Sequence, residues 1–165
     1  MYESRHRGRL PMTMSTLTLA LLSAVTLLTL LSVGADPDPL SAYRWTNRLL
    51  VLYVPDTQAG RATLQSFRTS LDDRMEDVLV RDLLIVPVGD LPRPGDTLQP
   101  AVDLGVPERS AVRRRLGLHG RGAQLVLIGK DGGIKAQQSE GGFDLERLFA
   151  LIDSMPMRRA EMGQR

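Results

Sequence analysis

Short, continuous apolar runs along the chain alternate with stretches in which apolar residues recur every three or four positions. Residues 49–54 read LLVLYV and end at Pro55, residues 83–88 read LLIVPV, and residues 125–128 read LVLI. Continuous runs of this length predict strands that are buried on both faces of a sheet.

The recurring apolar positions predict helices between and after these strands. Residues 59–79 predict a single helix whose inward face carries Leu64, Phe67, Leu71, Met75 and Val78. Pro107 and Gly117 are typical of the first residue and the closing residue of a short helix. Residues 143–155 predict a last helix that Met155-Pro156 ends, and its inward face carries Leu145, Leu148, Phe149 and Ile152.

The order of these elements predicts the fold class. A strand, a helix and a second strand are typical of a βαβ unit with parallel strands. Asp131-Gly132 predict a tight turn between residues 125–128 and a strand at 134–136, and hence an antiparallel hairpin. We therefore expect an α/β domain with a central mixed sheet of about four strands flanked by helices. Residues 89–106 form a long irregular stretch, and such loops are often functional.

The N-terminal residues are typical of an export signal. Basic residues up to Arg9 precede an apolar stretch at 17–31, and small residues follow in Val33-Gly34-Ala35. We expect cleavage after Ala35, which places the protein in the periplasm or outside the cell. The alternative is an uncleaved membrane anchor, because the apolar stretch counted from Met12 approaches the length that spans a bilayer. The expected parts are a signal peptide at 1–35, a linker at 36–42, one domain at 43–157 and a C-terminal tail at 158–165.

Composition excludes several classes of function. None of the 165 residues is cysteine, so the chain has no disulfide, thiol nucleophile, iron–sulfur cluster or Cys-ligated zinc. The formal charge of +2 arises at the N-terminus, since removing residues 1–35 takes away three Arg and one Glu and leaves equal numbers of basic and acidic residues. This balance gives no case for binding nucleic acid.

Three stretches carry a resemblance to a known family: residues 43–50 (YRWTNRLL), 128–133 (IGKDGG) and 152–159 (IDSMPMRR). On these residues the chain resembles the DUDES-type family of domains of unknown function. That family occurs in exported bacterial proteins and in vertebrate extracellular proteins such as equarin and the sushi-repeat proteins. The resemblance covers residues 40–162 and implies a single thioredoxin-like domain without an established activity. The order strand, helix, strand, helix, strand, strand, helix is also that of the thioredoxin fold.

The positions that carry thioredoxin chemistry hold other residues in this chain. Pro55-Asp56-Thr57-Gln58 stand where a Cys-x-x-Cys would follow the first strand, and Ala123-Gln124 stand where a cis-proline would be. Thiol–disulfide exchange needs a thiolate, so oxidoreductase, isomerase and thiol peroxidase activities are excluded. Ligands of open α/β sheets bind at the carboxyl ends of strands. We expect any remaining site there to be bordered by Asp56, Trp45, Arg121 and the loop at 89–106.

Other side chains offer weaker alternatives. Arg113 is a further candidate contact for an anion, but Arg113, Arg114 and Arg115 are consecutive on a helix and cannot all face one ligand. The carboxylates Asp72, Asp73, Glu76 and Asp77 are typical of a solvated helix face. Soft thioether ligands suit Cu(I), which makes a copper site from His119, Met155, Met157 and Met162 an alternative. A Ser/His/Asp triad through His119 lacks the Gly-x-Ser-x-Gly motif.

The function expected from the sequence is an exported, redox-inactive module that binds a protein or a cell-envelope component. We expect no cofactor and no metal, and contact with a membrane only through the N-terminal segment if it is not cleaved. The alternatives are an enzyme of non-thiol chemistry that uses Asp56 and Arg121, and a copper-handling protein.

Overall fold

The computed structural model describes residues 38–92, 98–139 and 142–164. The predicted signal peptide lies outside these residues. The described elements, in chain order, are η2 (Ser41–Tyr43), β1 (Arg48–Tyr53), α2 (Gln58–Asp73), α3 (Met75–Leu79), β2 (Leu83–Pro87), α4 (Val106–Leu116), β3 (Gln124–Ile128), β4 (Ile134–Ser139), α5 (Leu145–Ser154) and α6 (Pro156–Gly163). No helix in the described part of the chain is both long and apolar enough to cross a membrane.

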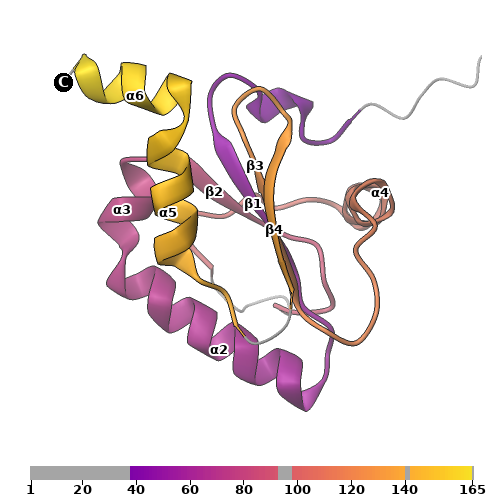
Figure 1. Ribbon diagram of the computed structural model, residues 1–165. Coiled ribbons are helices and arrows are strands. Elements are labelled where there is room, and N and C mark those ends of the chain that lie inside the picture. Colours follow the sequence, from indigo (N-terminus) through magenta and orange to yellow (C-terminus); the bar gives the residue numbers. More distant parts are fainter. Residues whose placement is uncertain (1–37, 93–97, 140–141, 165) are drawn as a thin grey trace, which may run out of the picture. The chain divides into compact units, whose positions relative to one another are not determined.

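The four strands form one mixed sheet in the order β2-β1-β3-β4 (Figure 1). β1 and β2 are parallel, and α2 and α3 connect them, as the predicted βαβ unit requires. β3 pairs antiparallel with both β1 and β4, which confirms the predicted hairpin. The expected α/β fold with a four-stranded mixed sheet is therefore confirmed.

Each face of the sheet has its own apolar core, because the residues of the central strands alternate between the two faces. Leu50 and Leu52 of β1 point to the face that α2, α3 and α5 cover. Leu49 and Val51 point to the face that α4 covers (Figure 1). All six residues of β1 are buried, which explains why its sequence is a continuous apolar run after Arg48.

The predicted helix at 59–79 is two helices. α2 ends at Asp73, and Arg74 has φ −124° and ψ 24°, outside the helical region, before α3 begins. The apolar spacing continues across the break, since Val78 of α3 is buried in the same core as Leu71 of α2. Periodicity reports which residues face the core and not whether the backbone hydrogen bonds are continuous, so it missed this break.

The prediction of a C-terminal tail at 158–165 is wrong over most of its length. Pro156 follows the end of α5, as expected, because Met155 is extended (φ −69°, ψ 141°). The same proline is the first residue of α6, a position where its fixed φ and missing N–H suit a helix. The only buried residue of α6 is Arg158, so the helix carries no apolar stripe that the sequence could reveal.

Candidate functional site

Asp56, one of the residues expected to border a site, lies at the carboxyl end of β1. Asp56 is exposed two residues after the end of the apolar run and forms an ion pair with Arg61 of α2. Thr57 is the N-cap of α2, and its hydroxyl accepts a hydrogen bond from the N–H of Gly60 at 3.0 Å. The polar groups of this turn therefore hold the start of α2, as expected of a helix cap.

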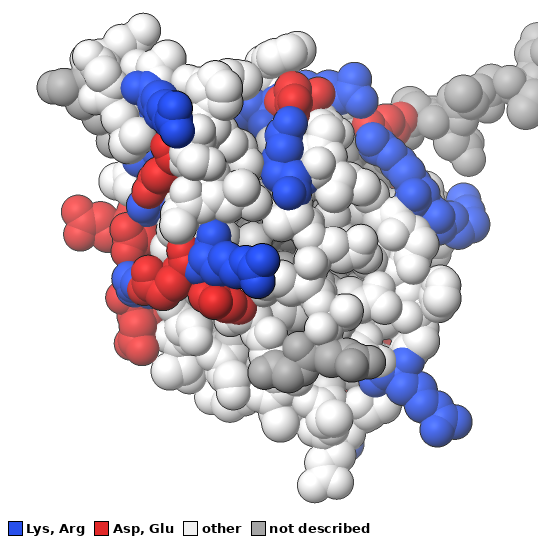
Figure 2. Space-filling view, viewed as in Figure 1, with Lys and Arg blue, Asp and Glu red and all other residues white. Residues whose placement is uncertain are grey.

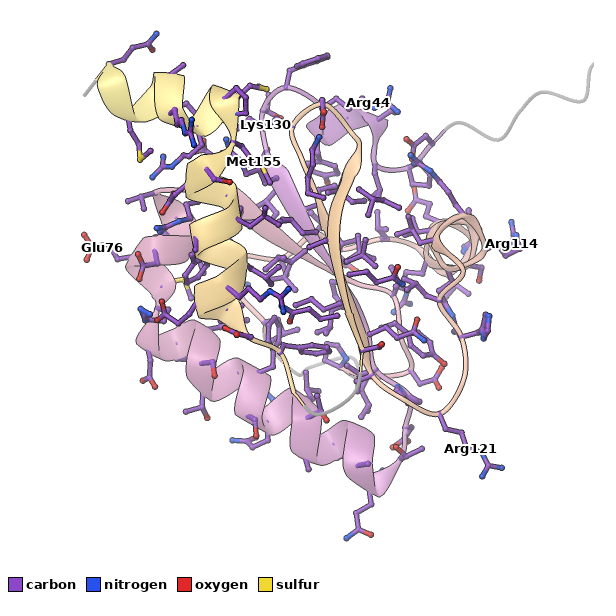
Figure 3. The ribbon with its side chains drawn as sticks, in the orientation of Figure 1. Arg44, Glu76, Arg114, Arg121, Lys130 and Met155 are labelled. Carbon is purple, nitrogen blue, oxygen red and sulfur yellow. The ribbon has the colours of Figure 1, made fainter. Side chains whose placement is uncertain are left out.

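A cavity of about 230 Å³ lies beside this turn. Its walls come from the first two turns of α2, the loop before β3 and the residues before α5. Its lining includes Gly60, Thr63, Arg121, Ala123 and Phe143. Arg121 is exposed, and its side chain extends away from the body of the domain (Figure 3). The cavity is lined mostly by apolar atoms and has one cation at its border.

The three consecutive arginines of α4 point in different directions, as the helical spacing predicts. The guanidinium of Arg113 lies 4.8 Å from the centre of the Tyr53 ring and 3.5 Å from the Asp90 carboxylate. Arg115 forms an ion pair with Asp38. Arg114 extends into solvent (Figure 3). Arg113 therefore packs α4 against the carboxyl end of β1, and these three residues form no common anion site.

Trp45 lies at the other end of the sheet, and the interpretation that it borders the same site is wrong. It precedes β1, whereas Asp56 follows β1, and six residues of extended strand separate the two ends. The N–H of Trp45 donates a 2.7 Å hydrogen bond to the carbonyl oxygen of Lys130, in the turn between β3 and β4. Proximity to β1 in the sequence was misleading, because residues before and after an extended strand lie at opposite ends of it.

Sequence reasoning missed a cluster of charged residues at this amino-terminal end of β1. Arg48 is 1% exposed, and its guanidinium donates to both carboxylate oxygens of Glu161, at 3.2 Å each. It also donates to the carbonyl oxygen of Arg81 at 2.9 Å. The ammonium of Lys130 donates to Glu161 and to Asp82, at 2.8 Å each. One carboxylate of α6 therefore binds cations from the start of β1 and from the β3–β4 turn.

The cluster continues along α5 and the turn before β2. Arg158 is 5% exposed and donates to the carbonyl oxygen of Val80 at 2.6 Å and to Asp153 at 3.2 Å. Arg81 donates to the two oxygens of Asp153 at 3.1 and 2.5 Å, and its guanidinium lies 4.7 Å from the centre of the Phe149 ring. Figure 2 shows basic and acidic side chains next to one another on the left of the molecule, where Figure 1 has α3, α5 and α6. We call Arg48, Arg81, Asp82, Lys130, Asp153, Arg158 and Glu161 the charge cluster.

The charge cluster stabilises the ionised form of its carboxyl groups. Burial opposes ionisation of Glu161, but hydrogen bonds from Lys130 and Arg48 outweigh it and lower its pKa from 4.5 to about 2. Burial also opposes ionisation of Asp153, and hydrogen bonds from Arg81 and Arg158 lower its pKa nonetheless. A buried charge is tolerated only when it is paired and hydrogen-bonded, and the two buried cations, Arg48 and Arg158, meet that condition through these carboxylates. The cluster therefore fastens α6 to the domain.

The three stretches that carry the family resemblance meet in this cluster. Arg48 belongs to the first stretch, Lys130 to the second, and Asp153 and Arg158 to the third. An arginine directly before an apolar run and an arginine after a helix-ending proline were signals in the sequence, but their partners lie far apart along the chain. Arg48 and Glu161 are 113 residues apart, and no periodic pattern joins them.

The arrangement gives no support to the copper alternative. His119 precedes β3, whereas Met157 and Met162 lie on α6, which binds Lys130 beyond the other end of β3. Within residues 38–92, 98–139 and 142–164, no three His, Asp or Glu side chains are grouped so that they could hold a metal ion.

Comparison of the sequence with protein families gives a match over residues 39–161 to DUF4174, described as a domain of unknown function. The chain belongs to the DUF4174 family. The match covers every described helix and strand up to α6 and includes Glu161, the residue through which α6 binds the charge cluster. No curated protein matches the chain in sequence.

Solved structures similar to this DUF4174 domain include peroxiredoxins. The mitochondrial 2-Cys peroxiredoxin of Plasmodium falciparum has a TM-score of 0.50 and 11% identity, over 76% of this chain and 84% of that chain. The reduced 2-Cys peroxiredoxin of Plasmodium vivax has a TM-score of 0.51 and 14% identity, over 73% of this chain and 72% of that chain. At such identities the likeness shows the fold alone. The DUF4174 domain is therefore thioredoxin-like, and it has this fold without any cysteine.

Proposed function

We propose that this DUF4174 protein is an exported, redox-inactive binding module that contacts a protein or a component of the cell envelope. The observation that carries the proposal is the turn after β1. In place of a Cys-x-x-Cys it has Pro55–Gln58, and its polar side chains hold α2: Thr57 caps the helix, and Asp56 binds Arg61. Thiol chemistry needs a thiolate, so the thioredoxin-like fold acts here without it.

The cavity beside this turn supports a binding function. At about 230 Å³ it is smaller than the pockets that hold whole cofactors or drug-sized ligands. Its size and apolar lining suit one side chain of a partner protein, inserted between Thr63 and Phe143. Arg121 at the border suits a partner with an acidic group next to that side chain, because an arginine pairs well with a carboxylate.

Export is supported by the N-terminal sequence, in which basic residues, an apolar stretch at 17–31 and small residues up to Ala35 follow one another. The resemblance to DUDES-type domains, which occur in exported and extracellular proteins, supports the same location. Fractionation of cells that express the full chain, with mass measurement of the N-terminus, tests this part. We expect the protein outside the cytoplasm, and a protein that stays in the cytoplasm would refute export.

Site-specific crosslinking tests the binding site. A photoreactive amino acid at Thr63, which lines the cavity, is compared with the same group at Gln137, which is exposed on β4. We expect a discrete adduct from Thr63 and none from Gln137. Arg121→Ala should weaken the Thr63 adduct, and Arg121→Lys should retain part of it. Equal adducts from both positions, or no adduct from Thr63, would contradict the proposed site.

A further inference from the structure

Trp45 is presented to solvent by a backbone that does not favour it. Its φ is +67°, in the left-handed region that bulky residues rarely adopt, and its side chain is 68% exposed. The conformation is fixed by the hydrogen bond from its N–H to Lys130 and by a turn in which the N–H groups of Thr46 and Asn47 both donate to Tyr43. Strained backbone that displays a large apolar side chain is typical of a functional surface.

Other exposed apolar side chains lie on the segments that meet at the same end of the sheet. Ile134, which is 56% exposed, follows the β3–β4 turn to which Trp45 is bonded. Met157 is 39% exposed and lies on α6, which the charge cluster holds to that same turn. Figure 1 shows α6, the β3–β4 turn and η2 at one end of the domain. We call Trp45, Ile134 and Met157 the apical surface.

The domain is joined to the N-terminal segment next to the apical surface. Asp38 is the first described residue, and its carboxylate lies 3.5 Å from the guanidinium of Arg44. Arg44 immediately precedes Trp45. Only residues 32–37 separate Asp38 from the end of the apolar stretch at 17–31. Six extended residues span about 20 Å at most. If the apolar stretch stays in a bilayer, the apical surface is therefore held close to the lipid surface.

The chemistry of the apical surface fits a lipid surface. Tryptophan is enriched at the membrane–water interface because its ring is amphipathic. The exposed cations Arg44 and Arg159 flank Trp45 and Met157 in the sequence, and arginine side chains place their apolar stems along lipid while the charge reaches water. The short link at residues 32–37 gives the domain a high effective concentration at the lipid surface. A few apolar side chains are then enough for docking.

We propose that the apolar segment is retained as an anchor and that the apical surface docks on the lipid bilayer, with the ring of Trp45 in the interface. This goes beyond the proposed binding function and does not depend on it, because the cavity beside Thr63 lies at the opposite end of β1 and stays open to a partner. The anchor, which is the alternative by sequence, is favoured here by the position of the exposed apolar side chains.

The experiment uses the full chain in phosphatidylcholine vesicles. Trp45 is the only tryptophan, so all tryptophan emission reports on the apical surface. We expect its emission to shift to shorter wavelength and to be quenched by lipids that carry a spin label near the headgroup. The matched control is Trp45→Phe combined with Gln58→Trp. Gln58 is exposed at the start of α2, at the other end of β1, and a tryptophan there should keep the emission of an exposed ring and escape the lipid quencher.

Four results would overturn the inference. Emission of Trp45 that is unshifted and unquenched by labelled lipid would show that the ring stays in water. Equal quenching of the Gln58→Trp reporter would show that no particular end of the domain faces the bilayer. Protection of Trp45 from acrylamide that appears only at a high ratio of protein to lipid would identify a second copy as the occupant. Mature protein beginning after Ala35 in cells would remove the anchor and leave the proposed binding function intact.

Discussion

Replacing Glu161 by glutamine tests whether the charge cluster holds α6. The substitution keeps the shape of the side chain and removes its charge. Arg48, which is 1% exposed, then keeps the carbonyl oxygen of Arg81 but loses the carboxylate to which it donates two hydrogen bonds. Lowering the Glu161 pKa from 4.5 to about 2 corresponds to about 3 kcal/mol, at about 1.4 kcal/mol for each pKa unit. The side chain is 25% exposed, so solvent screens part of this. We expect Glu161→Gln to reduce the free energy of unfolding at pH 7 by about 2 kcal/mol.

The direction of the pKa shift determines how this difference in the free energy of unfolding changes with pH. The pKa of Glu161 is lower in the folded protein than in the unfolded chain, so its stabilisation is complete above about pH 4.5 and is lost as the pH falls toward 2. Urea unfolding, followed by far-UV circular dichroism of the wild-type and Glu161→Gln proteins at several pH values, measures this. The difference between the two proteins should shrink steadily below pH 4.5.

A matched control is Glu76→Gln. Glu76 lies on α3, is exposed and extends into solvent away from the charge cluster (Figure 3). Its replacement should change the free energy of unfolding by less than about 0.5 kcal/mol. The reasoning would be refuted if Glu161→Gln were as stable as the wild type at pH 7, or if its deficit stayed the same between pH 7 and pH 2.

Two further substitutions test how the fold is built around the carboxyl end of β1. Gly89→Ala would place a Cβ only 2.3 Å from the backbone nitrogen of Val54, so we expect the free energy of unfolding in urea to fall by about 2–3 kcal/mol. The control is Gly122→Ala, whose Cβ would meet open space and should leave the stability close to that of the wild type. Thr57→Ala removes the cap of α2 and should cost about 1 kcal/mol, whereas Thr57→Ser should restore most of the stability. A Thr57→Ala protein as stable as the wild type would show that the hydrogen bond to Gly60 is not needed.

The strands were predictable because burial on both faces leaves a direct record in the sequence. Residues 49–54, 83–88 and 125–128 are apolar without interruption since helices cover both sides of β1, β2 and β3. β4 lies at the edge of the sheet and is mostly exposed. It was therefore predicted from the turn at Asp131-Gly132 and not from an apolar run. The break at Arg74 and the helix α6 were not predictable from apolar spacing, because neither changes which apolar residues face the core.

The candidate site was predictable only in part. Asp56 and Arg121 lie at the carboxyl end of β1 and at the nearby cavity, as the fold rule for open sheets predicts. Trp45 does not, and Arg113 is already engaged with Tyr53 and Asp90. Whether a charged side chain is free or paired depends on partners from other elements, which a linear pattern does not contain.

By itself, the sequence determined the absence of thiol chemistry, the covalent link to an apolar N-terminal segment, and the order of strands and helices apart from the break at Arg74 and the helix α6. These depend on composition and on local periodicity, which are readable residue by residue. Only the tertiary structure decided that Arg48, Lys130 and Glu161 share one ion-paired cluster and that Trp45 and Asp56 lie at opposite ends of β1. Such pairings form only when the folded sheet brings segments together that are distant in the sequence. Their energy depends on all members of the network at once, so no single stretch of chain contains it.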